Sequence, residues 1–234
     1  MSKGRTQRFL VVGLFLIGAT LLGKGLYMQA KAHFAQYLIE QAWTKTLADG
    51  QSHKPWSWAD TYPVAKLSIY REQAAKNDIE AELNDSLYVL AGASGRNLAF
   101  GPSLVLSSAP AGQKGNTVIA GHRDTHFAIL NGMTVGRRLS LQTLKGNHII
   151  YEVVATQVVH ETETQFMAPS ADNRLTLITC YPFDTLQGGA ELRFVVQAIP
   201  VEDEPMETVS ADVSTSTGDG MPGKVASLSR SFTH

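Results

Sequence analysis

The chain has 234 residues, of which 44% are hydrophobic and 18% are charged, and its formal net charge is −1 at pH 7. This composition provides enough apolar side chain for the core of one globular domain. The near-neutral charge, without a basic stripe beyond the N-terminus, excludes nucleic acid as the partner. The single cysteine, Cys180, excludes an intrachain disulfide and a cysteine-based zinc site. That thiol is therefore either an inert core residue or a nucleophile.

The N-terminus predicts a membrane anchor. Basic residues precede an uncharged run of 15 residues, Phe9–Gly23, and apolar character continues past Lys24 to about residue 29. Because basic flanks stay in the cytoplasm, the rest of the chain is expected across the membrane. A cleaved signal peptide is the alternative, since Ala30-Lys31-Ala32 has the small-x-small form of a cleavage site. Both interpretations place the body of the protein outside the cytoplasm.

Two segments between the expected anchor and the expected barrel have sequence patterns of their own. Residues 27–48 have apolar positions three, four or seven apart, which predicts a juxtamembrane helix that ends at Asp49-Gly50. The connector 54–63 is rich in tryptophan and proline, and it is expected either to lie on the membrane interface or to pack on the domain. The expected organisation is a cytoplasmic basic tail over 1–8, a transmembrane signal-anchor over 9–29, a juxtamembrane helix and linker over 30–62, a folded domain over 63–200 that contains a polar insertion at 71–84, and a disordered tail over 201–234.

The folded domain reads as a series of short strands with Gly, Pro and Asn turns between them. Strands are expected over 65–70, 87–90, 117–120, 139–143, 148–159, 175–180 and 192–198. Ser94 is expected to cap a short helix that runs into Phe100. Many short strands with little helix predict a mainly β fold, in the form of a closed or nearly closed β-barrel.

Two strand ends and one strand interior carry the candidate chemistry. Cys180 ends an apolar strand, because Pro182 cannot continue a central strand. His122 also follows an apolar strand and is the best candidate to exchange a proton with the thiol, since two strand ends can meet at one edge of a barrel. Arg193, in the strand after the Cys180 loop, is the candidate for stabilising an oxyanion, and Arg123 is the alternative cation.

Two other interpretations of these residues remain. Cys180 can be a buried, inert thiol, which is the common state of a free cysteine. His122, Asp124 and His126 alternate, so on an extended chain they point the same way and form a candidate metal site. The apolar residues from Phe127 onward predict a helical turn there, which breaks this alternation and gives His126 a helix-terminal or packing role.

The segment Thr176-Leu177-Ile178-Thr179-Cys180 resembles the TLxTC signature of sortases, the membrane-anchored cysteine transpeptidases. His122 and Arg193 lie where that family places its histidine and arginine, and the resemblance covers about residues 56–200. The segments 121–127 and 179–183 are most similar to the class found in Gram-negative bacteria. The resemblance implies an eight-stranded sortase-like β-barrel with short helices. Some sortases have a calcium site, but no acidic cluster in this sequence matches it, so neither a metal nor a cofactor is expected.

The resemblance also implies a reaction. The substrate is a secreted protein that ends in a Leu-Pro-x-Thr-Gly-like sorting motif, an apolar segment and basic residues. Cys180 attacks the carbonyl after the motif threonine and forms a thioacyl enzyme. His122 protonates the leaving amine and later accepts a proton from an incoming amine, while Arg193 holds the oxyanion or the motif backbone. Thr179, Thr176 and Ile178 are expected to contact or position the substrate.

The acceptor and the compartment complete these expectations. The identity of the acceptor amine is open, and hydrolysis by water is the alternative outcome of the same chemistry. A non-catalytic, anchored binding module is the alternative from another class of function. The expected location is the inner membrane, with a single span and the domain facing the periplasm.

Overall fold

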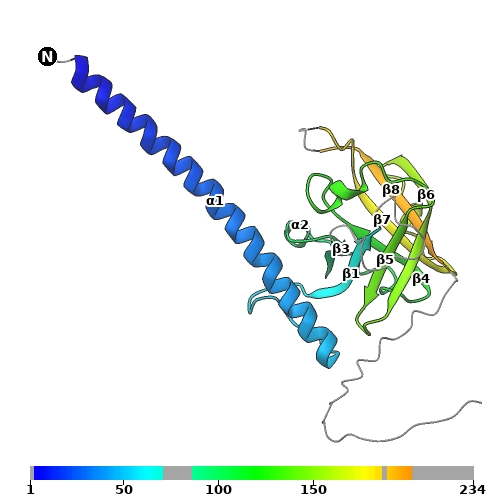
Figure 1. Ribbon diagram of the computed structural model, residues 1–234. Helices are drawn as coiled ribbons and strands as arrows, with labels where there is room; N and C mark the ends of the chain where they lie inside the picture. The colour runs from blue at the N-terminus through cyan, green and yellow to red at the C-terminus, as the bar shows by residue number, and fades with distance from the viewer. Residues whose placement is uncertain (1–2, 71–85, 186–188, 202–234) are drawn as a thin grey trace, which may run out of the picture. The chain divides into compact units, whose positions relative to one another are not determined.

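The folded domain is a closed β-barrel of eight strands, which confirms the predicted fold class (Figure 1). The computed structural model describes residues 3–70, 86–185 and 189–201. The strands are β1 Pro63–Ile69, β2 Leu87–Ala91, β3 Ser103–Leu104, β4 Gly115–Ala120, β5 Arg138–Thr143, β6 His148–His160, β7 Asn173–Tyr181 and β8 Leu192–Pro200. Their order around the barrel is β1-β2-β3-β4-β7-β8-β6-β5. The pairs β2–β3 and β4–β7 are parallel, which sets β4 beside β7 despite their separation in sequence.

The sequence pattern did not predict β3. Its two residues, Ser103 and Leu104, are both buried and pair with β2 and β4. A strand of two residues is too short to show an alternation of apolar and polar side chains. The predicted insertion at 71–84 and, apart from Val201, the predicted tail at 201–234 lie outside the described residues.

The core fixes β7 between its two neighbours. Leu177 faces Ile119 of β4 on one side and Val196 of β8 on the other, and all three side chains are fully buried. Burial of such a side chain contributes about 1.5–3 kcal/mol relative to leaving it exposed. Because side chains alternate along a strand, the residues at even positions of β7, including Cys180, lie on the outer face of the barrel.

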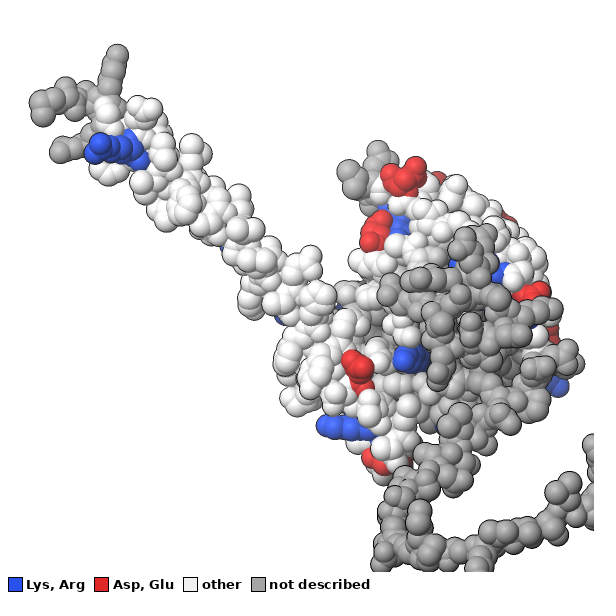
Figure 2. Space-filling model, viewed as in Figure 1, with Lys and Arg blue, Asp and Glu red and all other residues white. Residues whose placement is uncertain are grey.

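A single α-helix, α1 Lys3–Asp49, precedes the barrel and joins the predicted anchor to the predicted juxtamembrane helix. Within the described residues, this is the one helix that is long and apolar enough to cross a membrane. Figure 2 shows its N-terminal part as an almost unbroken uncharged surface that follows a basic side chain near the start of the helix. The large apolar side chains there, including Phe9, Phe15 and Leu22, are each at least 60% exposed, so no protein atoms cover them.

The C-terminal part of α1 packs on the barrel instead. Its buried positions, Ala35, Ile39, Ala42, Trp43 and Thr46, are spaced by one, three or four residues and form one helix face. Trp43 Nε1 donates to Gln142 Oε1 at 3.3 Å, which fixes this face against β5.

A short helix, α2 Gly95–Leu98, lies between β2 and β3. Ser94 Oγ accepts a hydrogen bond from the Asn97 backbone nitrogen at 3.2 Å, which confirms the predicted cap. The helix ends at Leu98, before Phe100, and the Asn97 side chain turns inward and donates to the Ala91 and Gly92 carbonyl oxygens.

Candidate active site on β4, β7 and β8

Cys180 is the second-last residue of β7 and carries a free, half-buried thiol. The preceding residue, Thr179, points into the domain and is only 2% exposed. The chain leaves the strand after Tyr181, so the thiol is held by a fixed strand and is open on one side. This is a suitable position for a nucleophile, because a rigid strand orients the sulfur atom and leaves it accessible.

The parallel pair β4–β7 brings His122 to the level of Cys180. Ala120 is the register partner of Ile178, and the Gly121 backbone nitrogen continues this pairing by donating to the Ile178 carbonyl oxygen at 3.1 Å. Thr179 Oγ1 donates to the Gly121 carbonyl oxygen at 2.8 Å and ties the two chains once more. The next residue, His122, is exposed. His122 therefore lies at the register position beside Cys180, although 58 positions separate these two residues in the sequence.

The antiparallel pair β7–β8 places Arg193 on the other side of the thiol. Cys180 and Arg193 are direct register partners. Directly opposite residues of an antiparallel pair share a face, and their Cβ atoms lie about 5 Å apart. His122, Cys180 and Arg193 thus occupy neighbouring register positions in one row across β4, β7 and β8, with Cys180 in the middle. The structure brings together all three residues proposed from sequence as catalytic.

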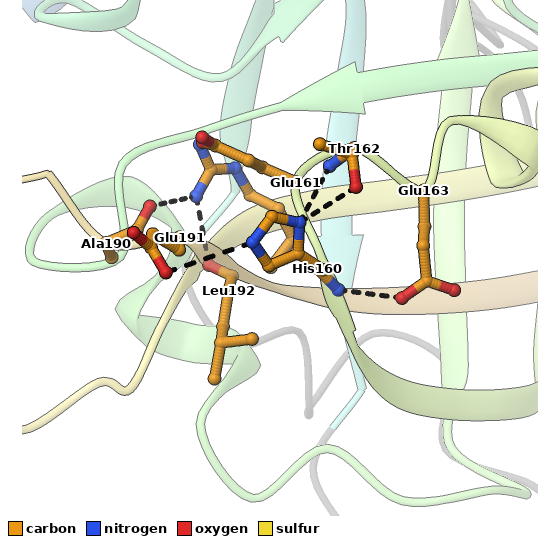
Figure 3. A network of polar contacts seen from close by, with 8 residues as sticks. His160, Glu161, Thr162, Glu163, Ala190, Glu191 and Leu192 are labelled. Carbon is orange, nitrogen blue, oxygen red and sulfur yellow. Dashed lines mark hydrogen bonds and ion pairs between the residues drawn. The ribbon is translucent and has the colours of Figure 1, made fainter.

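The Arg193 guanidinium group is held at the mouth of the β7–β8 connection. Its nitrogens donate to the carbonyl oxygens of Ala190 at 2.6 Å and Leu192 at 3.0 Å, and to Glu161 Oε2 at 2.7 Å. Figure 3 shows Glu161, Ala190 and Leu192 converging at the junction where β6 ends and β8 begins. The Glu161 backbone also donates to the Glu191 carbonyl oxygen at 2.7 Å, which continues the β6–β8 pairing to this point.

Asn116 anchors the segment between β6 and β7 to the outer face of the barrel. Its Nδ2 donates to the carbonyl oxygens of Phe166 at 2.8 Å and Ala168 at 3.1 Å, beside the short 3-10 helix η2 Gln165–Met167. Its Oδ1 accepts from Thr176 Oγ1 at 2.7 Å. Asn116 is 3% exposed, and both polar atoms of its side chain, Nδ2 and Oδ1, make hydrogen bonds. The sequence pattern does not single out Asn116, whose one signal is an amide side chain at the start of an otherwise apolar strand.

The three predicted substrate contacts occupy different environments. Thr176 is fully buried and bonded to Asn116, and Thr179 is buried and bonded to Gly121, so both side chains brace the strand from within the protein. Ile178 is half-buried and lies on the same face as Cys180, two residues before it. Of the three, Ile178 has the side chain available to a bound peptide.

Arg123, the alternative cation, connects the two loops that flank the site. Its side chain is 7% exposed, Nε lies 3.3 Å from Asp124 Oδ1, and Nη2 donates to the Thr185 carbonyl oxygen at 3.3 Å. Thr185 follows β7, so this contact joins the chain after His122 to the chain after Cys180. Burial and these contacts give Arg123 a structural position beside the site.

The metal interpretation of the His122 segment receives no support. Over the described ranges, no group of three His, Cys, Asp or Glu side chains is arranged to hold a metal ion. The 3-10 helix η1 His126–Leu130 begins at the third candidate ligand, as the apolar residues from Phe127 predict, and breaks the alternation. His126 is half-buried. Its pKa is lowered mainly by desolvation and, to a smaller extent, by the charge of the nearby His122.

Gly121 is required by the packing of Phe127. A Cβ atom on Gly121 would lie 2.6 Å from ring atoms of Phe127, whose side chain is fully buried and cannot move away freely. We expect Gly121→Ala to lower the free energy of unfolding by about 1–3 kcal/mol through this overpacking. Urea unfolding measures the change. The matched control is Gly95→Ala, where nothing lies within 4 Å of the added Cβ, and equal loss in both variants would contradict this reasoning.

Comparison with known proteins identifies the class that this barrel and its row of residues define. The profile of the family described as the sortase domain matches residues 79–201, more than half of the chain. Sortase D of Bacillus subtilis is 29% identical over 116 residues, which cover 49% of this chain and 58% of that protein. Sortase A of Listeria monocytogenes is 26% identical over 183 residues, 73% of this chain and 80% of that protein.

Solved structures show the same fold. A lid mutant of sortase A from Corynebacterium diphtheriae has a TM-score of 0.52 at 21% identity, covering 74% of this chain and 96% of that one. Sortase C1 of GBS Pilus Island 1 has a TM-score of 0.52 at 19% identity, covering 79% of this chain and 89% of that one. The chain belongs to the sortase family, a family of cysteine transpeptidases.

Proposed function

We propose that this protein is a membrane-anchored sortase that cleaves a sorting motif of a secreted protein and transfers it to an amine. The observation that carries the proposal is the row of His122, Cys180 and Arg193 across the end of β4, β7 and β8. Acyl transfer through a thiol needs a nucleophile, a proton carrier and a positive group for the oxyanion, and this row offers one of each.

The proposed reaction has two halves. In the first, the Cys180 thiolate attacks the carbonyl carbon after the motif threonine, and the C–N bond breaks as the His122 imidazolium gives its proton to the leaving amine. In the second, an amine attacks the thioester and loses a proton to His122, and the sulfur leaves as thiolate. The enzyme returns to its starting state with no net change in protons or electrons.

Arg193 is proposed to stabilise the oxyanion of both tetrahedral intermediates. We expect Arg193→Ala to lower the rate of transfer by about 10²- to 10³-fold, the usual loss when one oxyanion donor is removed. Steady-state kinetics with a sorting-motif peptide measure this loss. Arg174→Ala is the matched control. Arg174 lies on β7, the strand of Cys180, but it is six residues from Cys180 and is bonded to Asp172. Equal rates in the two variants would remove Arg193 from the mechanism.

The proposed substrate is a peptide of the Leu-Pro-x-Thr-Gly kind, with Ile178 in contact with it and Thr179 and Thr176 acting as positioning residues. Thr179 holds the carbonyl group next to His122, and Thr176 supports Asn116 and through it the β6–β7 segment. We also propose the class found in Gram-negative bacteria, on the similarity of residues 121–127 and 179–183 to that class.

The proposed location follows from α1. Residues 1–8 would lie in the cytoplasm, residues 9–29 would span the inner membrane, and the juxtamembrane segment 30–62 would lead to a barrel over 63–200 in the periplasm. The uncharged and uncovered side chains of the N-terminal half of α1 support this arrangement.

The test is a transfer assay on the full chain in detergent. A fluorescent peptide with the sorting motif is incubated alone, with triglycine or lysine, and with hydroxylamine, which captures any thioester whatever the natural acceptor. The expected product with hydroxylamine is the peptide hydroxamate, identified by mass. Hydrolysis that no amine alters would support a cysteine endopeptidase instead, and an uncleaved peptide with an unreactive thiol would support a binding module.

A further inference from the structure

We propose that the connector between α1 and β1 makes a second membrane contact, in which Trp58 lies in the headgroup layer of the bilayer that α1 crosses. The inference rests on the proposed membrane anchoring. It assigns the lipid interface as the partner of an aromatic surface formed by the exposed Trp58 and the half-buried Trp56 and Phe100.

The connector runs back along α1 toward its apolar half. The His53 backbone donates to Thr46 Oγ1 at 3.3 Å, so the connector starts beside residue 46 of the helix. Further on, the Trp56 ring packs edge-on against Phe100 with centroids 5.1 Å apart, and the Phe100 carbonyl oxygen accepts from Gln36 Nε2 at 2.6 Å. Between residues 46 and 36 the helix rises by about 15 Å. The aromatic surface therefore lies that much nearer the apolar half of α1 than the start of the connector does.

The level of Gln36 sets the height of this surface above the bilayer. Gln36 comes seven residues after residue 29, where the proposed span ends, which is about 10 Å along the helix axis. Headgroups extend about 5–7 Å beyond the hydrocarbon core on each side. A tilt of the helix, about 20° on average, brings one side of the packed domain closer still. An indole ring that projects from this level can reach the headgroup layer.

Trp58 has the chemistry that such a position requires. Its side chain is 74% exposed, and its ring is 5.4 Å from that of Trp56. Tryptophan combines a large apolar body with one N–H donor and is enriched at membrane interfaces. On α1 itself, Phe34 and Tyr37 are 61% and 53% exposed and stacked at 6.5 Å, close to the same level.

The charges around the aromatic surface favour a lipid headgroup. Asp60, two residues after Trp58, is paired with Arg96 at 3.3 Å, and Glu40 is exposed on α1 about one turn further from the span than Gln36. Lys31 and Lys54 are both exposed, one on α1 below this level and one in the connector. Lysines beside interfacial aromatic residues are attracted to phosphate groups. The continuity with the uncovered apolar half of α1 points to the bilayer rather than to a second copy of the chain.

Quenching of tryptophan fluorescence by lipids tests the contact in the full chain, reconstituted in phosphatidylcholine vesicles. The chain has three tryptophans, and Trp43 is 3% exposed and lies against β5. A nitroxide on the lipid headgroup is expected to quench Trp58 and so to lower the emission of the wild-type chain by up to about a third, the share of one of its three tryptophans, because indole rings at the interface lie at the headgroup level. Trp58→Phe should remove most of that decrease in emission, whereas Trp43→Phe should leave the absolute decrease in emission unchanged.

A probe inside the proposed span separates this inference from the anchoring on which it rests. Phe15→Trp is introduced into a chain in which Trp43, Trp56 and Trp58 are replaced by Phe, and its emission is measured with a nitroxide near the end of the lipid tail. If that probe is quenched while Trp58 is not, the anchor stands and the second contact is wrong. If the probe is not quenched, the anchoring is wrong as well. Emission of Trp58 that no lipid quencher alters, because a second chain covers it, would also overturn the inference.

Discussion

Cys180→Ala is expected to abolish thioester formation and to lower the rate of transfer by about 10⁴-fold or more, the loss seen when the nucleophile of a covalent mechanism is removed. The chain has no second cysteine that could take over the attack. The substitution removes one half-buried sulfur atom at the end of β7, so the barrel is expected to remain folded. Intact-protein mass spectrometry after acid quenching detects the acyl adduct in the wild-type chain and its absence in the variant.

Alkylation of the wild-type chain provides the matched control for this prediction. Iodoacetamide modifies a thiolate, so a reactive Cys180 should be modified at neutral pH in the folded protein, with loss of transfer in proportion. Pre-incubation with the sorting-motif peptide should slow the modification. A Cys180→Ala variant with wild-type rates, or a thiol that reacts only after unfolding, would place Cys180 among inert core cysteines.

His122→Ala is expected to lower the rate of transfer by about 10³- to 10⁴-fold without loss of the fold, because its proposed role is proton transfer. His122 is exposed at the end of β4, where its side chain contributes little to the core. Both halves of the reaction should slow, and the wild-type dependence of rate on pH should be lost. Steady-state kinetics across pH, together with the unfolding midpoint in urea, separate the two effects.

His126→Ala is the control for the histidine prediction. The two residues are four apart in one loop, but His126 is half-buried at the start of η1, and burial lowers its pKa, which favours its neutral form. We expect its replacement to change stability modestly and transfer by no more than a few-fold. Unfolding of His122→Ala with normal activity of the remaining folded fraction would assign His122 to packing instead.

The sequence allowed the barrel and the row of candidate residues to be predicted for a physical reason. Gly121-His122 and the Cys180 segment each follow an apolar strand, and a strand end is recognisable from the change in composition alone. The alternation of apolar residues in the segments around Leu177 also defined which face is buried. These are local signals, and seven of the eight strands carried them.

The remaining features depend on contacts between distant segments. Arg193 is separated by 32 positions from Glu161, which binds its guanidinium group, and neither residue alone indicates the other. Asn116 contacts carbonyl oxygens of a segment 50 positions away, and backbone carbonyls have no sequence signature. The packing of Phe127 on Gly121 likewise depends on the path of the loop between them. Such partners are set by tertiary structure, which composition and periodicity do not report.

The parallel pairing of β4 with β7 has a consequence for when the thiol acquires its neighbours. The two strands meet only after the chain has closed a loop of 58 positions, and contacts of such separation form slowly. Until β4 pairs with β7, Cys180 therefore lacks His122 beside it, whereas Arg193 can pair with it through the β7–β8 contact alone. The pairing of β4 with β7 would therefore complete the proposed catalytic row by placing His122 beside Cys180. A chain arrested before this step would lack the proposed proton carrier beside its thiol.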